Sequence, residues 1–249
     1  MFSIPRNEHY KAFHDVNPLW ESFEPYILKH NHRQGKAGKW TEVINRIREG
    51  KDALTKDDIK VLKSRITKKP FLVEDALHVF YTNEEVNSHN EKMLNTLKTS
   101  LETIKALKSK NVPGKINKAG MIDKTPFMNV LKVKIGARIC LTSNIRLIDD
   151  LVNGSMGTVM AFERDKENEI VAIIVKFDDA KSGIKTREDN PVLSEKYKHF
   201  NGTPIFRTEL DYYVKSNKGK SQGLKAKVTQ FAMRLAWAFT SHKMQVSND

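Results

Sequence analysis

The amino-acid sequence predicts an α/β domain that is interrupted by an antiparallel β module. Three observations lead to this expectation. Apolar residues follow helical spacing from Trp40 onward. Between Leu131 and about Val214 they alternate with polar residues, and turn residues separate the short runs. An apolar segment near the C-terminus, Arg234–Phe239, then returns to the α/β pattern. A chain of 249 residues is long enough for one large domain or two smaller ones.

The first two helices have clear start and stop signals. One helix face carries Trp40, Val43, Ile44 and Ile47. Gly50 follows this face as a suitable helix stop. Thr55 is a good N-cap for a second helix, because Asp57 and Asp58 place negative charge in its first turn.

A strand, a helix and an irregular connection follow. Ala76–Tyr81 reads as a short strand, and Asn83 as the N-cap of a helix that runs from Glu84 through Met93. Residues 98–126 are rich in lysine and are interrupted by Pro113, Gly114, Gly120 and Pro126. They predict a loop or an irregular connection.

The period-two region predicts a small antiparallel barrel. Its clearest strands are Gly157–Phe162, Ile170–Val175 and Phe206–Val214. Asn153-Gly154 and Gly157 are expected in tight turns with positive φ, a structural role rather than a ligand-binding one. A flexible basic stretch from Lys215 to Lys227 leads to the last apolar segment.

The charge balance favours a polyanionic partner. Lysine and arginine number 43 against 30 acidic residues, which gives a net charge of +13. Nucleic acid fits this better than a membrane, because no apolar stretch is long enough to span a bilayer. A merely soluble basic protein is the alternative. The single Cys140 allows no internal disulfide, and the N-terminus lacks the apolar core of a signal peptide. Both observations argue against secretion.

Two clusters are candidates for phosphate contacts. Arg33, next to Gln34, can donate two hydrogen bonds to a phosphate if it faces a cleft. A solvated surface arginine is the alternative. His242 and Lys243 follow the C-terminal apolar run, where a nucleic-acid phosphate can bind. A locally satisfied histidine is the alternative there. Trp237 lies inside the apolar run, as Phe239 does, and both are expected in the core rather than stacked on bases.

Catalytic and metal-binding patterns are not found in the sequence. Gly219-Lys220-Ser221 resembles the end of a phosphate-binding loop, but the segment around it is rich in lysine and broken by glycine. Asp178-Asp179 follow an apolar strand, as a Mg²⁺-binding carboxylate does, but a turn is the better interpretation. His30 and His32 are too few for a metal site. We therefore expect no catalytic residue and no metal ligand in this chain.

Six segments share one resemblance. They are Leu19–Gln34, Asn45–Arg65, Phe80–Asn90, Leu131–Val159, Gln230–Ala238 and Leu235–Gln245. In this order they resemble segments of Pif/RecD-type (petite integration frequency) helicases, a superfamily 1 group of ATP-dependent DNA helicases that includes Helitron transposon relatives. The resemblance covers most of the chain.

The resemblance implies a fold and a domain organisation. The chain is expected to be part of the second RecA-like motor domain with an inserted SH3-like β-barrel. Residues 1–127 would hold the end of the first motor domain and the first part of the second. Residues 128–215 would form the SH3-like insert. Residues 216–249 would return to the second motor domain.

The resemblance also implies a function and site residues. The intact family unwinds DNA 5′ to 3′ with ATP and Mg²⁺, in the nucleus or alternatively the mitochondrion. Arg33 and Gln34 would sense the nucleotide. The single strand would be held by Thr240, His242, Lys243 and Gln245. Single-stranded or forked DNA is the expected partner, together with a missing N-terminal motor half.

The sequence also departs from the family pattern. The family's phosphate-binding loop and metal-binding carboxylate would precede residue 1, and its last arginine motif would follow residue 249. Met244 replaces the usual serine, and Val246 the usual glycine. We therefore expect a truncated chain that binds at most single-stranded DNA. Without the rest of the helicase, it is expected to bind neither ATP nor Mg²⁺ and not to hydrolyse ATP. A non-enzymatic nucleic-acid-binding module, or an inert transposon or gene-model remnant, are the alternatives.

Overall fold

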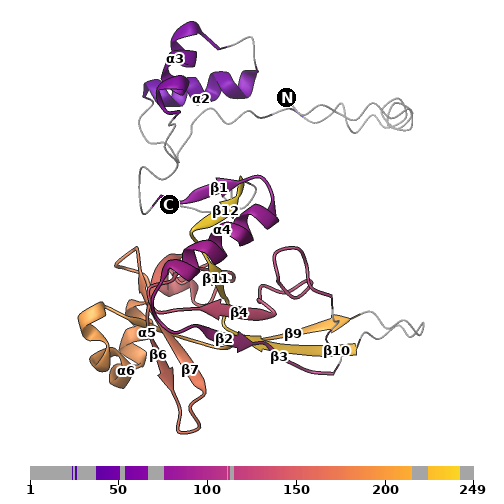
Figure 1. Ribbon diagram of the computed structural model, residues 1–249, viewed down its shortest axis with the longest axis vertical. Coiled ribbons are helices and arrows are strands. Elements are labelled where there is room, and N and C mark those ends of the chain that lie inside the picture. Colours follow the sequence, from indigo (N-terminus) through magenta and orange to yellow (C-terminus); the bar gives the residue numbers. More distant parts are fainter. Residues whose placement is uncertain are drawn as a thin grey trace. The chain divides into compact units, whose positions relative to one another are not determined.

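The computed structural model describes residues 24, 26, 38–50, 54–66, 76–110, 112, 115–214 and 224–241 (Figure 1). The chain divides into two compact units, Met1–Pro70 and Phe71–Asp249. None of the helices in these ranges is long and apolar enough to cross a membrane.

The described part of the first unit is a pair of helices, α2 (Lys39–Glu49) and α3 (Lys56–Ser64). Gly50 ends α2 with a φ of 118°, and the Thr55 side chain caps α3, as the sequence predicts. Val43 is fully buried, whereas 48% of Trp40 is exposed. The apolar face of α2 is therefore only partly covered.

The second unit begins with a parallel strand pair and a helix. Strand β1 (His78–Phe80) runs parallel to β12 (Ala238–Thr240), and helix α4 (Asn83–Thr96) follows β1. Thr82, rather than the predicted Asn83, is the N-cap of α4. The reason is a capping box, in which Thr82 and Glu85 satisfy each other's backbone N–H groups.

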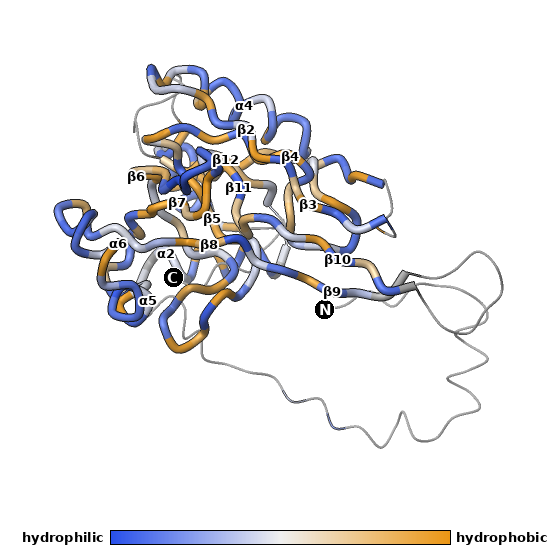
Figure 2. Tube along the Cα trace, turned by 90° about the horizontal axis from the view of Figure 1, so that it is seen from below, coloured by the Kyte–Doolittle hydropathy of each residue, from blue (hydrophilic) through white to orange (hydrophobic). Residues whose placement is uncertain are grey.

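A five-stranded antiparallel sheet forms the centre of the second unit. In sheet order its strands are β11 (Met233–Leu235), β5 (Arg138–Leu141), β6 (Met156–Arg164), β7 (Ile170–Phe177) and β8 (Thr203–Phe206). Its side chains form most of the main hydrophobic core. Figure 2 shows the hydrophobic colour concentrated on β5, β7 and β11, whereas α4 is mostly hydrophilic.

Two smaller sheets and four short helices complete the part of the second unit that the structure describes. One sheet has the order β3 (Leu107–Lys108), β10 (Leu224–Gln230) and β9 (Thr208–Val214), and the other pairs β2 (Glu102–Lys105) with β4 (Val130–Val133). The short helices are η3 (Leu147–Asp149), α5 (Ile184–Asp189), α6 (Pro191–Lys196) and η4 (Lys198–Phe200).

Several sequence expectations need correction in this region. Residues 98–126 are not only a loop, because they contain β2 and β3, whose partners β4 and β10 lie far along the chain. The antiparallel character of the β region is confirmed. Across the strands that the structure describes, however, the five-stranded sheet is open, with β11 and β8 at its edges. The SH3-like barrel therefore stays a prediction.

The two glycines expected in tight turns have different roles. Gly154 has a φ of 106°, as predicted. Gly157 instead lies inside β6 and is not among the residues with positive φ. A Cβ atom at Gly157 would lie 2.7 Å from the Lys176 carbonyl oxygen and 2.7 Å from Val175 Cγ1. This glycine is therefore needed for the close approach of β7, not for a turn.

Candidate nucleic-acid interface

The candidate site lies at the carboxyl ends of the two parallel strands. Their register pairs His78 with Ala238 and Phe80 with Thr240, so both strands end side by side (Figure 1). In open α/β sheets, ligands bind beyond the carboxyl ends of parallel strands. The residues that follow are Tyr81, which is 84% exposed, and Ser241, which is also exposed.

Thr240 is the one predicted DNA-binding residue that the structure describes. It is partly buried at the last position of β12. The other predicted site residues lie outside the described residues, namely Arg33, Gln34, His242, Lys243 and Gln245. The segment Gly219-Lys220-Ser221 also lies outside them. The predicted grouping of Thr240 with its cationic neighbours therefore stays a prediction.

The C-terminal apolar run crosses from one sheet to another. Its first part, β11, pairs with β5 in the antiparallel sheet, and its second part, β12, pairs with β1. Only Ala236 and Trp237 separate the two strands. Phe239 is buried and Trp237 packs against the main core, which confirms that these aromatic side chains serve packing.

Asn90 on α4 fixes this crossing. Its Oδ1 accepts hydrogen bonds from the N–H groups of Trp237 at 3.0 Å and Ala238 at 2.9 Å, and its Nδ2 donates to the Ala238 carbonyl at 3.3 Å. The N–H of His78 also donates to the Trp237 carbonyl at 2.9 Å. Sequence reasoning did not identify this role, although Asn90 belongs to the Phe80–Asn90 segment of the resemblance.

The N-terminus of α4 is not a phosphate cradle. Anions bind helix N-termini through free N–H groups and the helix dipole. Here the Glu85 carboxylate accepts from the Thr82 hydroxyl at 2.8 Å and from the Thr82 N–H at 3.0 Å. The hydrogen bond from the Thr82 side chain is the main cause that lowers the pKa of Glu85. A carboxylate therefore already occupies this end, and Glu84 adds a second one nearby.

A small aromatic cluster lies behind the strand pair. The ring of His89 on α4 lies 4.3 Å from the ring of His78 and 5.3 Å from that of Phe80. Burial, followed by the nearby His78 and Lys92, lowers the pKa of His89 below its usual value. Burial therefore disfavours the charged form of His89, and its ring packs against those of His78 and Phe80.

The acidic residue that follows β7 forms an ion pair. Strand β7 ends at Phe177, and the following Asp178 accepts two hydrogen bonds from Arg138, at 2.7 and 2.6 Å. Asp178 is thus engaged in an ion pair with the first residue of β5. Among the ranges given above, no group of three or more histidine, cysteine or acidic side chains is arranged to hold a metal ion.

Comparison with solved structures places this fold in a known class. No protein-family model and no curated protein sequence matches the chain. The fold is instead similar to part of Pif1 helicases, which are DNA helicases of mixed α/β architecture.

Three solved structures illustrate this similarity. Bacteroides Pif1 bound to ssDNA is 20% identical with a TM-score of 0.55, over 83% of this chain and 40% of that one. Bacteroides sp Pif1 in complex with ADP-AlF4 is 19% identical with a TM-score of 0.54, over 88% and 42%. Pif1 from Candida albicans is 20% identical with a TM-score of 0.54, over 87% and 46%. The chain thus spans less than half the length of these helicases.

Proposed function

We propose that this chain is the second motor part of a Pif/RecD-like, ATP-dependent DNA helicase that moves 5′ to 3′. In this proposal residues 128–215 form its SH3-like insert, flanked by motor segments 1–127 and 216–249. Its own biochemical activity is to bind single-stranded DNA through Thr240, His242, Lys243 and Gln245. Single-stranded or forked DNA is the partner, and the nucleus or mitochondrion is the compartment.

The parallel pair β1–β12 is the observation that supports this proposal best. It ends at Thr240, and the sequence continues directly into His242 and Lys243. A hydroxyl, an imidazole and an ammonium group then follow the carboxyl end of a parallel strand, where ligands of α/β domains bind. Backbone phosphates accept hydrogen bonds from such groups without regard to base sequence. The net charge of +13 favours the same partner.

ATP hydrolysis depends in this proposal on the first motor domain, which would supply the other side of the nucleotide cleft. Phosphoryl transfer needs a phosphate cradle with its lysine, and a carboxylate that holds Mg²⁺. The printed sequence contains neither pattern. Arg33 and Gln34 would contact the nucleotide from this side of the cleft. We therefore expect the chain alone to hydrolyse ATP at the background rate. A single-turnover rate above background that is lost in Arg33→Ala would contradict this expectation.

Fluorescence anisotropy of a labelled single strand tests the DNA-binding part. A strand of about 20 nucleotides is titrated at salt concentrations from about 50 to 200 mM. We expect saturable binding that weakens steeply with salt. Replacement of both His242 and Lys243 by alanine should weaken binding about tenfold and reduce the salt slope by about 1. Thr240→Val should weaken binding without changing the slope, because it removes a neutral hydroxyl group.

A control variant that removes at least as much charge separates this site from general basicity. Lys166 and Lys181 are exposed and lie in turns. Their replacement by alanine lowers the net charge by two, whereas replacement of His242 and Lys243 lowers it by one with histidine neutral. We expect this control to change the affinity by less than about threefold. An equal loss in both double variants would instead indicate a non-specific basic module. No binding by a folded sample would overturn the proposal and favour an inert remnant.

A further inference from the structure

Lysine residues are concentrated in one part of the second unit. Residues 105–134 contain eight lysines and one acidic residue, Asp123. This part of the chain holds β3, β4 and the last residue of β2. It contributes +7 of the net charge of +13, so the positive charge of the protein is unevenly distributed.

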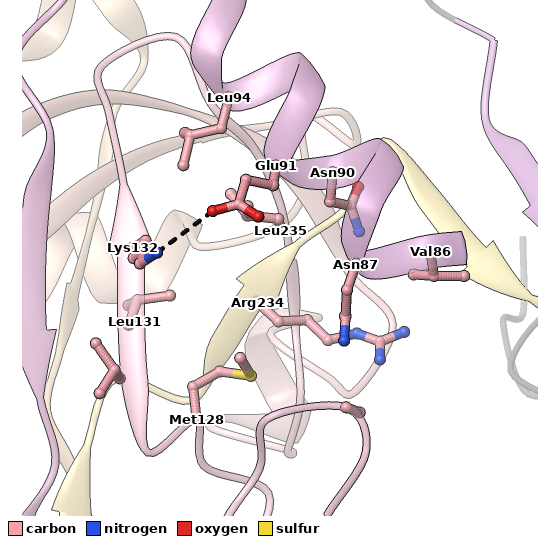
Figure 3. A pocket seen from close by; sticks show the side chains of 12 residues that line it. Val86, Asn87, Asn90, Glu91, Leu94, Met128, Leu131, Lys132, Arg234 and Leu235 are labelled. Carbon is pink, nitrogen blue, oxygen red and sulfur yellow. Dashed lines mark hydrogen bonds and ion pairs between the residues drawn. The ribbon is translucent and has the colours of Figure 1, made fainter. Parts of the chain in front are cut away.

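Three of these lysines lie beside helix α4. The Lys118 carbonyl accepts a hydrogen bond from Asn87 Nδ2 at 3.1 Å. The Lys132 ammonium pairs with Glu91 at 3.4 Å, and Figure 3 shows the two side chains reaching toward each other between β4 and α4. The Lys134 ammonium donates at 2.8 Å to the carbonyl of the C-cap residue of α4. The three lysines therefore follow the helix from its second turn to its C-terminus.

Lys105 widens this row across the β2–β4 pair. It lies opposite Val130, and Thr103 lies opposite Lys132. Residues two apart on a strand share a face, so Lys105 and Lys132 lie on one face of the pair with their Cα atoms about 7–8 Å apart. Both residues are exposed. Together these residues form a lysine track, which comprises Lys105, Lys118, Lys132 and Lys134.

The lysine track is accessible from the solvent. Lys105 and Lys118 are exposed, and the Lys132 side chain is 52% exposed although it pairs with Glu91. Among the described residues, Lys132 is the one member of the track that pairs with a carboxylate. The track therefore presents uncompensated positive charge at the surface, which is the electrostatic footprint of a polyanion site.

The track has no aromatic side chain on which a base can stack. The one aromatic residue of 105–134 is Phe127, which is 1% exposed. Helix α4 contains no phenylalanine, tyrosine or tryptophan. Proteins that bind single strands combine positive charge with aromatic stacking, whereas a duplex keeps its bases inside and is held largely through its phosphates. A row of lysines without aromatic neighbours therefore fits a duplex better than a single strand.

The track begins near the candidate nucleic-acid interface. Strand β1 ends at Phe80, and α4 begins at Asn83. The helix advances about 6 Å from Asn83 to Asn87 and about 14 Å from Asn87 to Thr96. One strand of a duplex advances about 3.4 Å per nucleotide, so the track matches about four base pairs. The carboxylates in the first turn of α4 lie between the two sites, so these are distinct surfaces.

We propose that the lysine track binds the phosphates of double-stranded DNA. The inference rests on the proposed function, because it places the duplex part of a forked DNA beside α4 and β4 while the single strand binds beyond Thr240. The track contacts phosphates only, so its binding does not depend on base sequence.

Fluorescence anisotropy of the 249-residue chain with three labelled DNAs tests the proposal. They are a single strand of about 20 nucleotides, a blunt duplex of the same length, and a fork that joins this duplex to two single-stranded arms. We expect saturable duplex binding, and fork binding at least about tenfold tighter than single-strand binding, because the fork engages both surfaces. No duplex binding, or no preference for the fork, would overturn the proposal.

A triple variant locates the duplex contact. Lys105→Gln, Lys118→Gln and Lys132→Gln remove three charges and leave Lys134 bonded to the end of α4. Duplex affinity should fall at least about tenfold, and the salt slope should decrease by about 3. Single-strand affinity should change by less than about threefold.

A matched control removes the same charge elsewhere. Lys166→Gln, Lys181→Gln and Lys185→Gln replace three exposed lysines that lie outside the track. This control should change duplex affinity by less than about threefold. An equal loss in both triple variants would overturn the proposal, because binding would then follow net charge alone.

The same titrations separate this inference from the proposed function. Duplex affinity unchanged in the track variant, with single-strand binding intact in the parent chain, would overturn the track and leave the proposed function standing. Duplex binding that is lost in the track variant, without single-strand binding by the parent chain, would support the track and contradict the site beyond Thr240.

Lysine acetylation of the parent chain tests the contact without any substitution. N-hydroxysuccinimidyl acetate modifies exposed lysines, and mass spectrometry measures the rate at each one. A saturating duplex should slow the acetylation of Lys105 and Lys118 but not of Lys166 and Lys181. Equal rates with and without duplex would overturn the proposal. Protection of the track by phosphatidylserine vesicles, but not by the duplex, would overturn it in favour of a membrane surface.

Discussion

Two buried amide side chains hold backbone segments that are remote in sequence. Asn90 binds the crossing between β11 and β12 with both ends of its amide. Gln230 donates from Nε2 to the carbonyls of Ile104 and Met128 and accepts from the Phe231 N–H. Buried polar groups require such partners. Neither amide carries a local sequence signal for this role, because the partners are backbone atoms far along the chain.

Asn90→Ala is expected to destabilise the second unit by about 3 kcal/mol, because it leaves two N–H groups and one carbonyl without a partner. Urea unfolding followed by near-ultraviolet circular dichroism measures the change. Asn87→Ala is the matched control on the same helix. Its side chain is exposed and donates one hydrogen bond to the Lys118 carbonyl. A loss below about 1 kcal/mol is expected there, and a similar loss in both variants would contradict the role of Asn90.

Helices α2 and α3 are joined by an ion pair between Arg46 and Asp58. Arg46 donates to both carboxylate oxygens of Asp58, at 2.7 and 2.8 Å. The Thr55 N–H and hydroxyl also donate to Asp58, at 2.9 and 2.7 Å. The Arg46 hydrogen bond, followed by those from Thr55, holds the pKa of Asp58 well below its usual range. The same carboxylate therefore caps α3 and joins it to α2.

This arrangement predicts an acid-sensitive helix pair. The folded pKa of Asp58 lies below its unfolded value of about 3.9, so its contribution is complete above about pH 4 and is lost as the pH falls toward the folded pKa. The ¹⁹F signal of fluorinated Trp40 reports on α2 during urea unfolding between about pH 5 and 2. We expect the midpoint to fall with pH, and to be lower and flatter in Asp58→Asn. Asp57→Asn, which removes an exposed carboxylate, should behave like the parent chain.

The sequence predicted elements whose signals are local. Gly50 and Thr55 were identified because a helix end depends on adjacent residues. Helix α5 was not predicted, because its first N–H groups, from Lys185 and Thr186, donate to the distant carboxylate of Asp149. In the candidate site, too, only the features with a local sequence signal could be predicted. The polar end of the apolar run was visible in the sequence, but its parallel pairing with β1 and the Asn90 contact were not.

At the scale of the whole molecule, the two units differ in how they are stabilised. Each of the hydrophobic clusters identified in the described ranges belongs to Phe71–Asp249. The described part of the first unit contributes Val43 as a buried apolar residue, together with the buried Asp58. The second unit thus has a core of its own, which is the requirement for independent folding.

The fragment Phe71–Asp249 is therefore expected to fold alone. Urea should unfold it in one cooperative transition with a free energy of about 5–15 kcal/mol. The full chain labelled with fluorinated tryptophan, in which the ¹⁹F signal of Trp237 reports on the second unit, is the control and should show the same midpoint. Strong binding of a hydrophobic dye without a cooperative transition would show that the core needs the first unit.

The crossing from β11 to β12 also has a mechanical consequence. Ala236 and Trp237 are the only residues between two sheets, and the N–H groups of Ala236, Trp237 and Ala238 are all bonded, to Arg138 or Asn90. Because this segment is short and its N–H groups are hydrogen-bonded, it has little freedom to change length. It therefore transmits a displacement of one sheet to the other. A tilt of the five-stranded sheet must therefore pull on β12 and move Thr240. Conversely, a load applied at Thr240 is transferred through Trp237 and Ala236 to β11, which pairs with β5.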